Sequence, residues 1–143
     1  MSAIAAAEAF EHAPVLAEQV GEGDAEAVMA RARALLEGMT EEQKIAVLNA
    51  HPRIGARSGL SARSAAEQRT TDSTDPATLR TLDLLNADYE RQFGFRFVVF
   101  VHGRSRAEIV PVLRARLGRS RDEELATGLA EFLAIARDRL EKR

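Results

Sequence analysis

The chain of 143 residues contains no cysteine and no tryptophan, and it has one tyrosine and three histidines. Without cysteine it can form neither a disulfide nor a thiolate metal site, and this composition fits a reducing compartment, so we expect a cytoplasmic protein. The 20 basic and 22 acidic residues give a net charge of -2, with no basic excess to indicate a nucleic-acid partner. No apolar run approaches the roughly 20 residues that a membrane-spanning helix needs.

The length and the fractions of apolar (45%) and charged (29%) residues are typical of one soluble globular domain over residues 1–143. The first ten residues are apolar but lack a basic start, which favours a helix over a signal peptide. Arginines alternate with acidic residues along the chain, and this pattern predicts solvated helix faces.

Helical patterns cover most of the sequence and predict helices over residues 3–20, 24–36, 40–51, 61–68, 76–93, 105–117 and 120–140. Three of these helices open with a capping box, in which a Ser or Thr and a Glu or Gln three residues later satisfy free backbone groups. The pairs are Thr40 with Gln43, Ser105 with Glu108, and Ser120 with Glu123. Pro111 lies inside its helix and is expected to kink it.

Residues 95–101 (FRFVVFV) break this pattern, because they are aromatic and β-branched and lie between Gly94 and Gly103. Their propensity predicts extended backbone, but we find no partner strand in the sequence. We therefore expect an all-α, single-domain helical bundle with one extended segment at residues 95–101. Its aromatic residues are core by default, although such a segment could also line a pocket.

Histidine titrates near neutral pH, which suits proton transfer, and His51 is followed by a proline that restricts the backbone around it. A histidine at a helix C-terminus can also be purely structural, favoured there by the helix dipole. Glu67 follows on a short predicted helix, where it shares a face with Ser64 and has Gln68 beside it. These three groups could converge on a small polar ligand, or Ser64 and Glu67 could simply form another capping box.

The spacing of the three histidines, at positions 12, 51 and 102, provides no local pair of metal ligands, so no metal site is expected. The glycines at 55 and 59 lack the Lys-Ser/Thr of a phosphate-binding loop. Acid–base chemistry without a metal is therefore one hypothesis for His51 and Glu67, beside the structural roles given above.

Four stretches together resemble the OHCU decarboxylases (2-oxo-4-hydroxy-4-carboxy-5-ureidoimidazoline decarboxylases), a family of urate breakdown. They are residues 10–14 (FEHAP), 51–55 (HPRIG), 64–68 (SAAEQ) and 85–97 (LNADYERQFGFRF). The matches occur in the family's order across nearly the whole chain, which makes the resemblance much more specific than any one motif.

The resemblance implies an all-helical fold and the cofactor-free loss of CO2 from the ureidoimidazoline to give (S)-allantoin, in a protein that is commonly a homodimer. It implies that His51 and Glu67 are the catalytic pair. It also implies a substrate site formed by Pro52, Ser64, Gln68, Phe97, Val98, Val99, Phe100, Val101, His102 and Arg104.

Two positions depart from the family pattern. Arg96 stands where the family stretch FGFPF has proline, and His102 stands where an arginine often holds the anionic end of the substrate. Arg104 is close enough in sequence to take that part. Two other interpretations remain open: an enzyme acting on another cyclic ureide or oxo acid, and a non-enzymatic module that binds a partner through exposed aromatic residues at 95–100.

Overall fold

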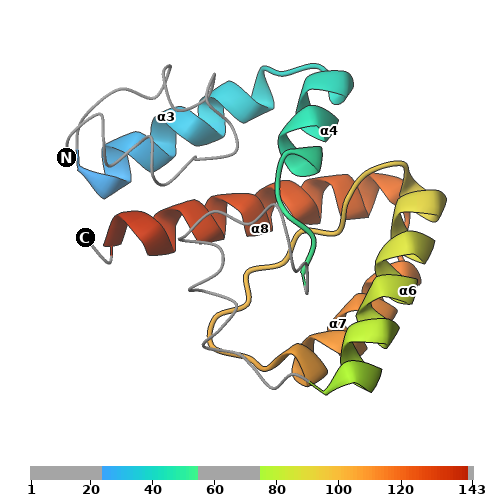
Figure 1. Cartoon of the computed structure of the whole chain (residues 1–143). Helices are drawn as coiled ribbons and strands as arrows, with labels where there is room; N and C mark the ends of the chain where they lie inside the picture. The colour runs from blue at the N-terminus through green and yellow to red at the C-terminus, as the bar shows by residue number, and fades with distance from the viewer. Residues whose placement is uncertain (1–23, 55–74, 142–143) are drawn as a thin grey trace.

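A computed structural model describes residues 24–54 and 75–141 of the chain (Figure 1). Within these ranges the structure is all-helical, with no strand. The helices are α3 (Ala25–Glu37), α4 (Glu41–Asn49), α6 (Pro76–Phe93), α7 (Arg106–Leu117) and α8 (Arg121–Glu141). The all-α prediction is confirmed, whereas the helices expected at 3–20 and 61–68 lie outside the described residues.

The predicted helix starts are present. Asp24 accepts a hydrogen bond from the Ala27 amide (2.8 Å) at the start of α3. All three capping boxes form, at Thr40, Ser105 and Ser120. These reciprocal bonds satisfy backbone N–H groups that have no partner inside the helix, which is why short polar motifs locate the helix starts well.

The two ends of α6 also follow the sequence. Asp75 caps its start and Pro76 occupies the first turn, where a missing N–H costs nothing. Gly94 ends the helix in the left-handed conformation, with φ of 84°. A residue without a Cβ adopts this conformation at little cost, so the chain turns here from α6 into the extended segment.

Helix α8 runs through the middle of the molecule (Figure 1). Helices α3 and α4 pack against α8, and α6 packs against α7 near the N-terminal end of α8 (Figure 1). Gly128 of α8 allows α4 to approach closely, because a Cβ at this position would lie 3.1 Å from Leu48 Cδ1. None of the described helices is long and apolar enough to cross a membrane.

The extended segment 95–101 connects α6 to α7 and supplies part of the core. Phe95 and Phe97 are 1% and 2% exposed, and Val98 and Val99 are also buried. The rings of Phe93, Phe95 and Phe97 all lie within 6.1 Å of a neighbouring aromatic ring in this cluster. The prediction of an extended segment threaded through a helical core is confirmed.

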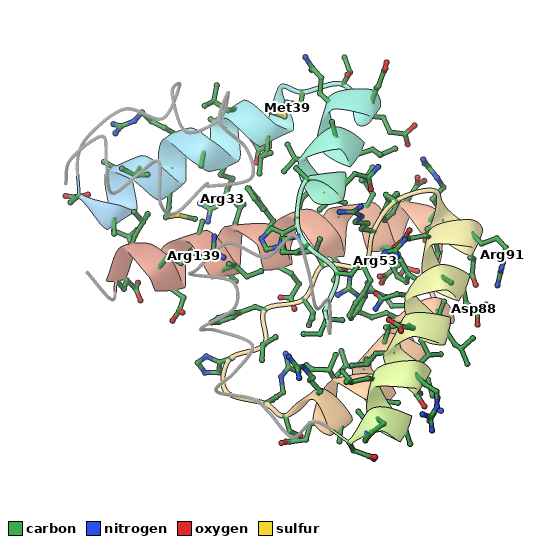
Figure 2. All side chains as sticks on the ribbon, in the orientation of Figure 1. Arg33, Met39, Arg53, Asp88, Arg91 and Arg139 are labelled. Carbon is green, nitrogen blue, oxygen red and sulfur yellow. The ribbon has the colours of Figure 1, made fainter. Side chains whose placement is uncertain are left out.

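The prediction that the arginines cover solvated faces is wrong for two of them. Arg116 and Arg139 are 6% and 2% exposed. Arg91 fits the prediction, since it pairs with Asp88 on the outer side of α6, away from the rest of the molecule (Figure 2). Charge alternation describes the outer faces, but it does not distinguish a surface arginine from one that a buried carboxylate neutralises.

Candidate active site

His51 lies just beyond the C-terminal end of α4 and is 9% exposed. Its amide donates to the Leu48 carbonyl (3.1 Å), which continues the last turn of the helix. Its imidazole meets the Phe132 ring of α8 edge-on, with the ring centroids 6.0 Å apart. The imidazole is therefore held against the central helix and does not lie on a free loop.

The residues that follow His51 are anchored to α6. Asn86 Nδ2 donates to the Ile54 carbonyl (3.3 Å), and the Ile54 side chain belongs to the core. Arg53 reaches toward α6 (Figure 2) and forms a bidentate pair with Glu90, with both N–O distances 2.6 Å. The bond to Glu90 raises the pKa of Arg53, so this guanidinium stays charged. Two neighbouring turns of one helix thus fix the segment that carries His51 and Pro52.

The extended segment is held from two further helices. The Val98 carbonyl accepts a 2.7 Å bond from Arg116 of α7, and the Phe100 amide donates to Glu131 of α8 (3.2 Å). The amide N–H groups of Phe97, Val98 and Val99 have no acceptor among the residues that the structure describes. Buried amide groups are nearly always paired, so the acceptors of these three come from outside the described residues.

The turn after the extended segment has an unusual backbone. His102 has a φ of 51° and Gly103 a φ of 77°. A non-glycine residue in this region is uncommon and marks a tightly determined turn. The His102 ring is exposed and lies 4.9 Å from the Phe100 ring.

Arg104 closes this turn with its own side chain. Its Nη2 donates to the Phe100 carbonyl (2.6 Å) and its Nε donates to the Val101 carbonyl (3.0 Å). Part of its hydrogen-bonding capacity is therefore used locally. Its charge still lies beside the start of α7, where an anion would be favoured.

The structure thus places the predicted residues of the described ranges in two neighbouring segments, 51–54 and 97–104. Arg96 links the two, because its guanidinium Nη1 donates to the His51 carbonyl (2.9 Å). Ser64, Glu67 and Gln68 lie outside the described residues, as does His12.

Sequence reasoning missed a buried polar cluster behind the extended segment. Glu124 Oε1 accepts bonds from Tyr89 Oη (2.6 Å) and from Arg116 Nε (2.7 Å), and Arg119 bonds its other oxygen (3.0 Å). Burial, reinforced by the bond to Glu124, raises the pKa of Tyr89 far above its ordinary value, so the phenol stays protonated and acts as a donor. The Arg116 guanidinium lies over the Phe97 ring, 4.5 Å from its centroid.

A signal for this cluster does exist in the sequence. Glu124 is four residues before Gly128 and eight before Phe132, so it falls on the buried face of α8. The sequence predicted a capping role for the neighbouring Glu123 and assigned no role to Glu124.

These features define an all-helical protein in which a buried histidine at a helix end is fixed beside an extended segment. A sequence model of the OHCU decarboxylase family matches residues 3–141, and the chain belongs to this family.

Known proteins and structures agree with that membership. The chain is 30% identical over 142 residues to 2-oxo-4-hydroxy-4-carboxy-5-ureidoimidazoline decarboxylase of Haloferax volcanii, covering 95% of this chain and 84% of the relative. It is 33% identical over 105 residues to the protein of the same name from Halalkalicoccus jeotgali, covering 72% of this chain and 60% of that protein. A crystal structure of OHCU decarboxylase in the presence of (S)-allantoin has the same fold, with a TM-score of 0.77, 24% identity, and coverage of 95% of this chain and 94% of that one.

Proposed function

We propose that this protein decarboxylates 2-oxo-4-hydroxy-4-carboxy-5-ureidoimidazoline to (S)-allantoin. The observation that carries the proposal is the buried and anchored His51, whose carbonyl accepts a hydrogen bond from Arg96 of the extended segment. Family membership supplies the substrate class.

In this proposal His51 engages the hydroxyl or the carboxylate of the substrate, and Glu67 governs delivery of a proton to one face of the intermediate. The bond to CO2 breaks, and its electron pair passes into the conjugated imidazoline ring, which is the substrate's own electron sink. The ring's capacity to accept electrons is the reason that we propose a cofactor-free reaction. General acid–base groups of this kind contribute about 10²- to 10⁴-fold in rate.

The remaining site residues would bind and orient the ring. Pro52, Ser64 and Gln68 would hold it in place, and the backbone of residues 97–101 would supply hydrogen bonds. His102 and Arg104, close to the start of α7, would face the anionic end of the substrate. We also propose a single domain, a homodimer and a cytoplasmic location, in line with the family resemblance and the absence of cysteine.

Of the two alternatives, the binding module has the weaker support. It needs exposed aromatic residues, whereas Phe95 and Phe97 are 1% and 2% exposed. The alternative of an enzyme that acts on a related cyclic ureide stays open, because His102 and Arg96 differ from the family pattern. Such an enzyme would turn over that ureide faster than the ureidoimidazoline.

The deciding experiment is circular dichroism of the allantoin formed from freshly generated ureidoimidazoline, with and without the protein. The substrate decays unaided to racemic allantoin, so a fast-growing signal of the (S) enantiomer is the expected result. His51→Ala and Glu67→Gln should each remove most of this signal while far-UV circular dichroism stays unchanged. Glu37→Gln, on the exposed end of α3, is the matched control and should behave as wild type. A racemic product formed at the uncatalysed rate by folded wild-type protein would refute the proposed function.

A further inference from the structure

Arg96 ties the end of α4 to the extended segment through two hydrogen bonds. Its amide donates to Asn49 Oδ1 (2.9 Å), and its guanidinium Nη1 donates to the His51 carbonyl (2.9 Å). Asn49 is the last residue of α4, and only the cap residue Ala50 separates it from His51. The backbone amide and the side chain of Arg96 therefore hold both sides of the turn in which α4 ends.

The end of α4 lacks a cation of its own. The last carbonyls of a helix lack intrahelical partners and carry partial negative charge, which a nearby cation stabilises. The last turn of α4 contains no basic residue. Pro52 has no amide N–H to donate back into the turn. The Arg96 guanidinium brings both a donor and a positive charge to this end of the helix.

The backbone that carries Arg96 is itself firmly placed. Phe95 and Phe97 on either side of it are buried in the aromatic cluster, while Arg96 is half-buried. Side chains of extended backbone alternate in direction, so core packing of the two phenyl rings directs Arg96 toward α4. Core packing therefore fixes where the Arg96 guanidinium lies, and the guanidinium in turn fixes the His51 carbonyl.

The His51 imidazole is restrained on its other side by the ring of Phe132. Movement of the α4 end would therefore shift or rotate the imidazole relative to the amide groups at 97–99. A displacement of about 1 Å at a catalytic group can cost about a hundredfold in rate.

We propose that Arg96 is a positioning residue for His51, which sets the imidazole relative to the extended segment by holding the His51 carbonyl. This inference rests on the proposed catalytic role of His51. Arg96 acts through that carbonyl and does not need to touch the substrate.

The test compares Arg96→Met with Arg121→Met as a matched control. Arg121 also donates to a backbone carbonyl, that of Phe93 (3.0 Å), and it pairs with Glu41 (2.6 Å). Both variants lose an arginine that donates to a backbone carbonyl, but only the first loses the bond to His51. Arg96→Lys keeps a charged donor, and Arg96→Gln serves as the second variant if Arg96→Met does not fold.

We expect Arg96→Met or Arg96→Gln to lower kcat by about ten- to a hundredfold with KM changed less than about threefold, because the chemical step depends on imidazole placement. Arg96→Lys should recover part of kcat, and Arg121→Met should keep the wild-type kcat at a temperature where it is folded. In the free protein, the NMR signals of the His51 ring should shift in Arg96→Met and coincide with wild type in Arg121→Met.

A wild-type kcat in Arg96→Met, or equal losses in Arg96→Met and Arg121→Met, would overturn the positioning role. If the wild-type protein does not turn over the ureidoimidazoline, the proposed function fails. The positioning role of Arg96 is then judged from the NMR signals of the His51 ring alone. A shift confined to the Arg96 variants then still supports the positioning of His51, and an unchanged signal refutes it.

Discussion

The hydroxyl of Tyr89 on α6 donates a 2.6 Å hydrogen bond to Glu124 Oε1 on α8, and both residues are completely buried. Arg116 of α7 completes the group by binding the same carboxylate oxygen and the Val98 carbonyl. Three helices and the extended segment therefore meet at one buried charge pair. This arrangement fixes the segment 95–101 at Val98, two residues before its hydrogen bond to Glu131 at Phe100.

The two partners of this pair should be strongly coupled in their contributions to stability. Glu124→Leu leaves the Arg116 charge buried and unpaired, and we expect it to lower the free energy of unfolding by about 3–5 kcal/mol. The double variant Arg116→Met/Glu124→Leu should cost clearly less than the two single variants added together. Urea unfolding of the four proteins measures the coupling, and strict additivity would show that the two side chains act independently.

Tyr89→Phe tests the third member of the cluster. It removes a single donor while Arg116 and Arg119 still satisfy the carboxylate, so a loss of about 1–2 kcal/mol in the free energy of unfolding is expected. A loss as large as that of Glu124→Leu would mean that the phenol, and not the arginine, chiefly stabilises Glu124.

The capping boxes should make stability depend on pH in the acid range. Hydrogen bonds from Ser105 and Ser120 lower the pKa of Glu108 and Glu123 below the ordinary value of 4.5. Since the pKa is lower in the folded state, the carboxylates contribute stability above about pH 4.5 and lose it as the pH falls through the folded pKa. We expect Tm to drop in that window.

The double variant Glu108→Gln/Glu123→Gln checks this origin. Glutamine also completes a capping box, so Tm at pH 7 should stay near the wild-type value. Below pH 4.5 the variant should lose Tm less steeply than wild type. Parallel curves of Tm against pH would assign the acid sensitivity to other carboxylates.

The turn at Gly94 should tolerate no side chain without cost. With φ of 84° and no atom within 4 Å of an added Cβ, Gly94→Ala tests backbone conformation alone, and we expect a loss of about 1–2 kcal/mol in unfolding free energy. Gly118 ends α7 with φ of -85°, so Gly118→Ala is the matched control and should be neutral or slightly stabilising. Equal effects in urea unfolding would contradict a conformational cause.

The anionic end of the substrate offers a kinetic prediction. If His102 and Arg104 face it, His102→Ala and Arg104→Ala should raise KM by about tenfold, close to 1.4 kcal/mol, with a smaller effect on kcat. Arg104 also closes its own turn through the Phe100 and Val101 carbonyls, so Tm of each variant must be measured alongside. Wild-type kinetics in both variants would remove these residues from the binding site.

The sequence alone determined those features that depend on residues close together along the chain. Helix starts at Thr40, Ser105 and Ser120 and the end at Gly94 were predictable because caps satisfy local backbone groups. The extended segment was predictable because β-branched and aromatic residues lie between two glycines. His51 stood out as a candidate because histidine is scarce in this chain.

Only the tertiary structure decided how distant residues satisfy one another. Arg96 looked like a mere departure from a family motif, yet it reaches a carbonyl 45 positions earlier in the chain. Glu124 directly follows the capping residue Glu123 in the sequence, yet it neutralises Arg116 inside the core. Such pairings depend on which helix faces meet, and a buried charge is tolerable only where the fold brings its partner within hydrogen-bonding distance.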